Sequence, residues 1–199
     1  TSQLVQRLKQ ISTGMGGNEP LTAEIMHVAK RAIASQFDDR YGGFGLQPKF
    51  PQPMTYEFLL RHNLRFQDPQ SLEMVELTLR KMAEGGIYDQ IGGGFHRYST
   101  DTYWMVPHFE KMLYDNALLV QLYVHAFQAT GNPLYRRIVE ETLDYVVREM
   151  TDSEGGFYSA QDADSEGVEG KFFVWRPEEI IEILGESDGE LVNAHYGVT

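Results

Sequence analysis

The sequence predicts an all-α protein in which helical hairpins with long loops lie side by side, as in an α/α toroid. The first observation is a repeat: Gly-Gly-Phe follows a predicted helix at residues 42–44, 93–95 and 155–157. Between successive copies there is room for two helices and a long loop, as in chains of stacked hairpins. The second observation concerns two consecutive predicted helices. The first, roughly residues 109–130, is apolar on nearly all sides, and the second, which begins at Asn132 and Pro133, has a single apolar stripe. The first kind is enclosed and the second lies outside, which predicts concentric layers.

The first elements follow from spacing and capping signals. Residues 1–12 carry apolar side chains at helical spacing, and a glycine-containing stretch over residues 13–18 follows. Thr22 is the expected N-cap of the next helix, with Leu21 and Met26 placed as a hydrophobic staple. The apolar stripes of these two segments are Leu4, Val5, Leu8 and Ile11, then Leu21, Ile25, Val28, Ala29, Ala32 and Ile33.

A loop over residues 37–53 separates these elements from the second hairpin. Its first helix is expected over about residues 55–66. Asp68 as a cap, with Pro69 at the first helical position, begins the helix that follows. That helix ends at Gly85-Gly86 and carries an apolar stripe of Leu72, Val75, Leu79 and Met82.

A second loop, residues 87–107, precedes the enclosed helix, which is expected over roughly residues 109–130. Asn132 and Pro133 begin the striped helix, whose buried face is predicted to be Leu134, Ile138, Leu143, Val146, Val147 and Met150.

In the third loop, residues 151–176, the segments 156–158 and 171–175 are expected to pair as a small β-hairpin. Pro177 opens a helix that stops at Gly185. Ser187 and Glu190 predict a capping box for the last helix.

Composition limits the function classes. The chain has 199 residues, 42% of them apolar, which is enough for one large domain or two small ones. Its formal charge of −12 repels phosphate backbones, and no basic cluster offsets it, so nucleic acid is not an expected partner. The absence of cysteine excludes thiolate chemistry. No apolar run reaches the ~20 residues of a membrane span, so we expect a cytoplasmic location with no membrane partner.

The second loop carries the densest set of chemical groups. His96 and His108 titrate near neutrality and can give and take protons. Trp104, with Tyr103, is a candidate stacking platform for a sugar ring or another flat ligand. Lys111, Asp115 and His108 are expected to share one helical face. The alternative interpretation is structural, with Lys111 and Asp115 forming a buried ion pair and His108 capping the helix.

The third loop begins with alternating carboxylates, Asp162 and Asp164. Such spacing resembles a calcium loop, but the twelfth position would be Phe173 where a bidentate glutamate is required, so no metal is expected. These two side chains are expected to bond turn amides or to project into the pocket of the second loop. A carboxylate pair drawn from different loops, Glu110 with Asp162, remains an alternative for glycosidase chemistry.

Four long motifs, taken in order, resemble those of the spermatogenesis-associated protein 20-like family, also called thioredoxin-domain-containing proteins. The motifs are Tyr41-Gly42-Gly43-Phe44-Gly45 with Pro48-Lys49-Phe50-Pro51, Gly92-Gly93-Gly94-Phe95-His96-Arg97-Tyr98, His108-Phe109-Glu110-Lys111-Met112-Leu113-Tyr114-Asp115-Asn116-Ala117 and Asp162-Ala163-Asp164-Ser165. The resemblance implies a thioredoxin-like domain joined to an (α/α)6 toroid related to N-acylglucosamine 2-epimerases and six-hairpin glycosidases.

On this resemblance, residues 1–199 form an incomplete (α/α)6 toroid domain, with residues 1–20 as a leading helix and linker. The thioredoxin-like domain of the parent chain is then absent from the sequence and is an expected partner. An incomplete ring leaves apolar helix faces uncovered, which predicts self-association.

The leading hypothesis is a carbohydrate-active domain, either a sugar epimerase or isomerase or a glycosidase-like enzyme, with no cofactor. Its expected catalytic residues are His96, His108, Glu110 and Asp115. Its expected substrate-binding residues are Arg97, Trp104, Lys111, Tyr114, Asp162 and Asp164. Two alternatives stay open: a non-catalytic recognition module that partners the thioredoxin-like domain, and a polar cluster that only fastens the loops. All three depend on the loops gathering on one rim.

Overall fold

The computed structural model describes residues 4–6, 8 and 22–199. The chain divides into two compact units, Thr1–Ser35 and Gln36–Thr199. In the first unit, residues 4–6 and 8 are helical and helix α2 spans Glu24–Ala34. The expectations for Ile11, residues 13–18 and Leu21 fall outside the described residues. Ala23 rather than Thr22 is the N-cap of α2, and no side chain caps the helix. No residue of α2 is buried, so its stripe residues Ile25 and Val28 stay about half exposed.

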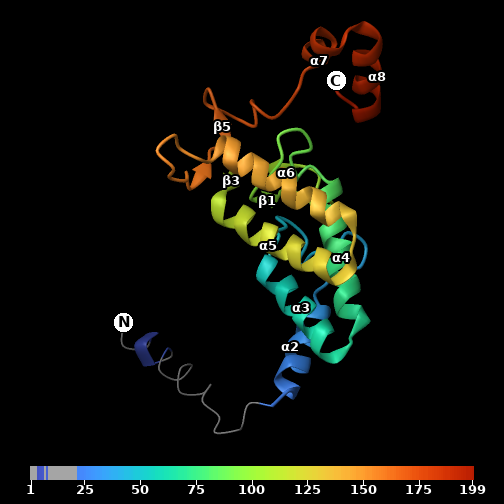
Figure 1. Ribbon diagram of the computed structural model, residues 1–199, viewed down its shortest axis with the longest axis vertical. Coiled ribbons are helices and arrows are strands. Elements are labelled where there is room, and N and C mark those ends of the chain that lie inside the picture. Colours follow the sequence, from blue (N-terminus) through green and yellow to red (C-terminus); the bar gives the residue numbers. More distant parts are fainter. Residues whose placement is uncertain (1–3, 7, 9–21) are drawn as a thin grey trace. The chain divides into compact units, whose positions relative to one another are not determined.

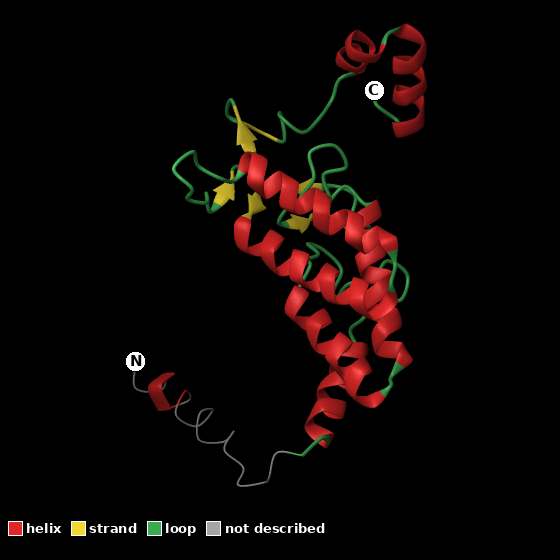
Figure 2. Cartoon of the chain, in the orientation of Figure 1, coloured by secondary structure: helices red, strands yellow, loops and turns green. Residues whose placement is uncertain are grey.

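The second unit contains the two predicted hairpins (Figures 1 and 2). The first pairs α3, Pro53–Phe66, with α4, Pro69–Glu84, and the second pairs α5, Leu113–Thr130, with α6, Pro133–Glu149. Helix α3 also packs along α5, and α4 contacts both α5 and α6. Two shorter helices follow, α7 over Pro177–Leu184 and α8 over Glu186–Tyr196, and they pack against each other.

Helix α5 is buried along one face, whereas its sequence predicts a helix enclosed nearly all round: five of its 18 residues are buried, and Ala117 is exposed. Its Leu119, Leu122 and Tyr123 are fully buried, and the Tyr123 hydroxyl donates to the Leu79 carbonyl of α4 at 2.7 Å. The ring of Phe95 stacks on Tyr123 with centroids 5.5 Å apart. The second Gly-Gly-Phe turn is thereby fixed to the core.

The predicted buried face of α6 is partly wrong. Ile138 is buried, but Leu143 is 47% exposed and Val147 is 70% exposed. The buried face instead consists of Tyr135, Ile138, Thr142 and Tyr145. This spacing of three and four residues is a helical face, and it was missed because two tyrosines and a threonine were counted as polar.

In the described loops of the second unit, the strands form three two-stranded antiparallel sheets. Strand β1, Tyr98–Ser99, pairs with β2, Pro107–His108. Strand β3, Lys111–Met112, pairs with β4, Ala160–Gln161. Strand β5, Asp164–Ser165, pairs with β6, Val168–Glu169.

Two expectations are therefore wrong. Residues 156–158 do not pair with 171–175, since Phe157 bridges Thr151 and the hairpin of this loop is β5–β6. Helix α5 begins at Leu113 rather than near residue 109, because residues 107–108 and 111–112 form β2 and β3 and pair with other segments.

Helix capping agrees with the sequence only in part. Asn132 caps α6, with its side chain accepting from the Leu134 amide at 3.1 Å, as expected. The predicted capping box at Ser187 is wrong, because α8 begins at Glu186 with Gly185 before it. At the start of α7, the carboxylate of Glu179 instead accepts from the Arg176 amide at 2.9 Å and from the Arg176 guanidinium at 3.1 Å.

The three Gly-Gly-Phe turns share one hydrogen-bond pattern, in which an upstream aspartate closes the bend. The amide of Asp89 donates to the Gly94 carbonyl at 3.0 Å, and the Gly93 amide donates back to the Asp89 carbonyl at 2.9 Å. Asp38 makes the equivalent bonds in the first copy, and Asp152 bonds the same two glycines of the third copy across a bend that is one residue shorter. The first two turns press against the following outer helix, on Thr78 of α4 and Tyr145 of α6, whereas the third has open space around it.

No helix in the described part of the chain is both long enough and apolar enough to cross a membrane.

Candidate functional site

The three long loops meet beside the first turns of α3 and α5. The amides of Lys49 and Ser99 donate to each other's carbonyls at 2.8 and 2.9 Å, which joins the first loop to the second. The β3–β4 pairing and a bond from the Leu113 amide to the Ser159 carbonyl at 3.0 Å join the second loop to the third. The prediction that these loops converge is confirmed.

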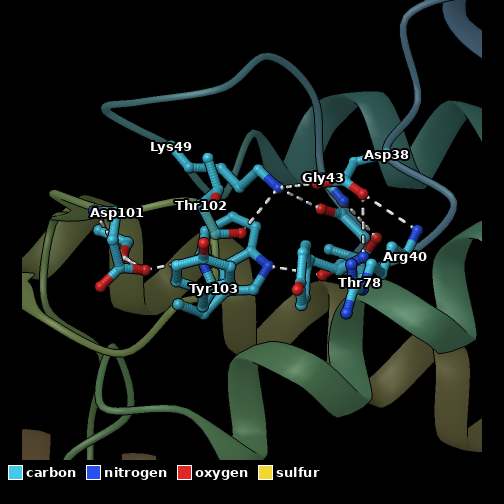
Figure 3. Close-up of polar contacts among 12 residues, drawn as sticks. Asp38, Arg40, Gly43, Lys49, Thr78, Asp101, Thr102 and Tyr103 are labelled. Atoms are coloured by element: carbon cyan, nitrogen blue, oxygen red, sulfur yellow. Dashed lines mark hydrogen bonds and ion pairs between the residues drawn. The ribbon is translucent and has the colours of Figure 1, made fainter.

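Lys49 is the centre of the contact between the first two loops (Figure 3). Its side chain is fully buried, and its Nζ donates to Asp38 Oδ2 at 2.6 Å, to the Gly42 carbonyl at 2.8 Å and to the Thr102 carbonyl at 3.0 Å. All three ammonium protons therefore have an oxygen acceptor. The pKa of Asp38 is lowered: burial alone would raise it, but the bonds from Lys49 and from two backbone amides outweigh burial. This group fastens a turn and is not available to a ligand.

Trp104 is also structural, and its predicted stacking role is wrong. Its side chain is fully buried against Gly43, and its indole Nε1 donates to the Tyr41 carbonyl at 2.9 Å. Asp101 holds this stretch by accepting from the amides of Tyr103 at 2.6 Å, Met105 at 3.2 Å and Val106 at 2.7 Å. Neither face of the indole is left for a sugar ring.

Lys111 repeats the arrangement of Lys49 in the second loop. Only 1% of its side chain is exposed, and its Nζ donates to Asp89 Oδ2 at 2.8 Å and to the Gly93 carbonyl at 2.9 Å. The ion pair weighed from the sequence exists, but Asp89 rather than Asp115 is the partner. Lys111 and His108 lie on strands, so the predicted helical face shared with Asp115 does not form.

His96 lies inside the packed structure. It is 2% exposed, its Nδ1 bonds the Phe109 carbonyl at 2.9 Å, and its ring packs edge-on against Phe109 and Phe173. Burial, reinforced by the Lys111 charge, lowers the pKa of His96 to about 4. It is therefore neutral at physiological pH and enclosed by aromatic rings, which contradicts the expected acid–base role.

The buried neutral state of His96 predicts acid sensitivity. Since its pKa is depressed in the folded chain, stability is complete above the unfolded value near 6.5 and falls as pH drops from there to about 4. The expected loss is roughly 2–3 kcal/mol by pH 4. Urea unfolding at pH 7 and pH 4 checks this: His96→Gln should show a smaller pH-dependent loss than the original chain. His195→Gln, at an exposed histidine, is the control and should not change the loss.

The accessible polar cluster is formed by Arg97, His108, Glu110, Asp115 and Glu169. Arg97 donates to Glu110 Oε2 at 2.7 Å, and His108 Nε2 lies 3.7 Å from the same oxygen. His108 Nδ1 bonds Glu169 Oε1 at 2.6 Å, and its ring stacks on Tyr98 with centroids 5.0 Å apart. We call these five residues the α5-entrance cluster. Glu169, on β6, was missed because nothing in the sequence predicts that β6 reaches the second loop.

Asp115 has the least satisfied side chain of the cluster. It lies in the first turn of α5, and its Oδ2 is buried without a hydrogen-bond partner among the described residues. Burial raises the pKa of Asp115 to about 6, although the Arg97 charge and Tyr114 act in the opposite direction. A carboxyl group with such a pKa can both accept and release a proton near neutrality.

The remaining predicted residues lie at the surface. Tyr114 is half exposed, and Asp162 and Asp164 are exposed. Asp162 Oδ1 accepts from the Asp164 amide at 3.0 Å, so one of the two carboxylates bonds a turn amide as expected. Within the described residues, no group of three or more histidine, aspartate or glutamate side chains is arranged to hold a metal ion.

Comparison with known sequences identifies relatives of this chain. Human spermatogenesis-associated protein 20 is 40% identical over the full chain, and the mouse protein is 42% identical over 82% of it. The chain is homologous to spermatogenesis-associated protein 20. It spans only 28% and 23% of the lengths of these two relatives. An uncharacterised protein from Caenorhabditis elegans is 40% identical over 76% of the chain, and no protein-family model matches. The resemblance to the spermatogenesis-associated protein 20-like family is thereby confirmed.

Solved structures confirm the α/α toroid fold of this homologue. A sugar epimerase from a ruminal bacterium superposes with a TM-score of 0.60 at 13% identity, over 69% of this chain and 41% of that one. Cellobiose 2-epimerase from Bacillus thermoamylovorans gives a TM-score of 0.59 at 11% identity, over 87% of this chain and 54% of that one. At such identities the likeness concerns the fold.

Proposed function

We propose that the α5-entrance cluster binds a sugar and moves a proton on the carbon beside its carbonyl group, as in epimerisation or isomerisation. Two observations support this proposal. Toroids of the same fold are named as sugar epimerases. The cluster also combines a carboxyl group, a histidine and an arginine, which are the groups that such proton transfer requires.

The proposal depends mainly on the unpaired carboxyl oxygen of Asp115. A partly buried carboxyl oxygen without a partner costs stability, and residues that cost stability concentrate at functional sites. With a pKa of about 6, Asp115 is largely ionised at neutral pH and can take the proton from carbon.

The other members of the cluster have complementary roles in this proposal. Glu169 bonds Nδ1 of His108 and so fixes the ring with Nε2 directed near Glu110. The protonated imidazole can then return a proton to the carbon, on the other face in epimerisation. Arg97 stabilises the negative charge that develops on the carbonyl oxygen after proton abstraction. Tyr114, Asp162 and Asp164 are available to bond sugar hydroxyls.

The experiment is proton exchange in D₂O, followed by NMR for glucose, mannose, N-acetylglucosamine and cellobiose. A substrate should lose the signal of the hydrogen beside its carbonyl. We expect Asp115→Asn to slow this exchange at least about a hundredfold, the usual cost of removing an acid–base group. Asp188→Asn is the matched control, since Asp188 also lies in the first turn of a helix, α8, outside the cluster. Absence of exchange with every sugar would reject the proposal.

Stability gives a second readout on Asp115. Its pKa is raised on folding, so it favours the folded state below about pH 4 and loses that contribution as pH rises to about 6. Asp115→Asn should therefore gain stability relative to the original chain between these pH values and keep the gain above pH 6. Urea unfolding from pH 4 to pH 8 measures this difference. A variant that is less stable than the original chain at pH 8 would mean that the carboxylate is a structural group.

A further inference from the structure

A separate cavity of about 350 Å³ lies between the second turn, α6 and the third loop. Its volume is in the range of small-molecule sites. Lys111, Tyr145, Arg148, Glu149, Gln161 and Trp175 are among the residues that line it. None of the five residues of the α5-entrance cluster belongs to this lining. Glu110 and Lys111 are adjacent in the chain, and only the second faces the cavity.

The two buried lysines differ in what surrounds the ammonium group. Lys49 Nζ has three oxygen acceptors, the third being the Thr102 carbonyl. Among the described residues, Lys111 Nζ has two, and it faces the ring of Tyr145 at 4.2 Å and that of Phe173 at 5.0 Å. The Lys111 ammonium therefore contacts aromatic faces where Lys49 has a third oxygen acceptor, so these rings form part of the cavity wall beside a cation.

The walls of the cavity combine flat apolar surfaces with hydrogen-bonding groups. Phe172, Phe173 and Trp175 come from the third loop, and Trp175 is 44% exposed. Gln161 accepts from the Tyr145 hydroxyl at 2.8 Å through Oε1, which leaves its amide N–H₂ group to donate elsewhere. Aromatic faces beside donors and acceptors suit a ligand that presents C–H faces and hydroxyl edges.

The charges around the cavity balance. Lys111 is paired with Asp89 at 2.8 Å, and Arg148 is paired with Glu149 at 2.8 Å. Arg148 is further held by the Gly92 carbonyl at 2.6 Å. Since both cations are already paired, an ionic ligand would find no free charge of opposite sign in the cavity. Its transfer from water would therefore cost free energy that no new ion pair offsets. We propose that this cavity is a binding site for an uncharged saccharide, stacked on Trp175 and bonded by Gln161.

Titration calorimetry with cellobiose tests the site, with glucose 6-phosphate as a charged probe of similar chemistry. We expect saturable binding of cellobiose and at least about tenfold weaker binding of glucose 6-phosphate. Binding should also change the tryptophan fluorescence, because Trp175 is half exposed whereas Trp104, the other tryptophan, is fully buried. Tighter binding of the phosphate, or no binding of cellobiose, would overturn the proposal.

Variants then locate the site. Trp175→Ala and Gln161→Ala should each weaken cellobiose binding by about tenfold, the value of one stacking or hydrogen-bonding contact. Phe157→Ala, at an exposed aromatic residue of the same loop outside the cavity lining, should leave affinity unchanged. Unchanged affinity in both lining variants would place the sugar elsewhere and reject the assignment.

Asp115→Asn separates this proposal from the catalytic one. That variant should lose proton exchange and keep its calorimetric affinity, because Asp115 does not line the cavity. Loss of calorimetric binding in Asp115→Asn would mean that the sugar occupies the α5-entrance cluster only, which also rejects the separate site.

Discussion

Replacing Lys111 with methionine is expected to lower the free energy of unfolding by about 4 kcal/mol, because the substitution leaves a carboxylate without its counter-charge. Asp89 then keeps its bonds from the Ile91 and Gly92 amides but loses the ammonium that accounts for much of its lowered pKa. The Gly93 carbonyl, a buried acceptor, also loses its donor. Methionine fills nearly the same volume, so the effect reports the charge rather than a cavity.

Lys171→Met is the matched control for this change. Lys171 also forms an ion pair, with Glu166, but its side chain is 50% exposed and that of Glu166 is 76% exposed. An exposed pair contributes little, so its loss should change stability by no more than about 0.5 kcal/mol. Guanidinium unfolding at pH 7 measures both variants. Equal small losses in the two would mean that the buried pair does not stabilise the fold.

Replacing Gly94 with alanine is expected to cost about 4 kcal/mol, from two causes. The residue has φ = +80°, where a Cβ is strained by about 1–2 kcal/mol. The new Cβ would also lie 2.4 Å from Cδ1 of Tyr145, a buried ring that cannot move without disturbing α6, and such overpacking costs about 1–3 kcal/mol.

Gly155→Ala isolates the first cause. Gly155 has φ = +89° in the third turn, but no atom would lie within 4 Å of its Cβ. Only the backbone strain of about 1–2 kcal/mol is then expected. Thermal unfolding of both variants measures the difference. Equal losses of stability at the two positions would show that the Tyr145 ring moves aside to accept the new Cβ at little cost.

The start of a helix could be predicted from the sequence where residues close by in the chain determine it. Pro69, Asn132 and Pro177 mark helix starts correctly, because a proline at the first position or a capping amide acts within one turn of chain. The Gly-Gly-Phe repeat likewise predicted two helices between copies. Strands β3 and β4 were missed because each is defined only by a partner far along the chain, as Lys111 is by Gln161.

The sequence predicted which segment forms the candidate site, but it did not predict the role of each side chain. Arg97, Glu110 and Asp115 do gather at the start of α5, but the chemistry of this segment depends on partners that the sequence does not reveal. Asp89 neutralises Lys111, and the Tyr41 carbonyl takes the indole proton of Trp104. From the sequence alone, the side chains of Lys111 and Trp104 were assigned to ligand binding. In the structure both are buried and hold the loops in place.

The open third turn has a practical consequence for labelling. The chain contains no cysteine, so one introduced thiol would be unique and would react with a maleimide dye at a known place. Ser153 is exposed on this bend, and Gly155 and Gly156 beside it have open space around them. A dye attached through Ser153→Cys would sit on the same loop that supplies Trp175. Sugar-dependent movement of the third loop could then be followed in real time without altering any residue of the α5-entrance cluster or of the cavity lining.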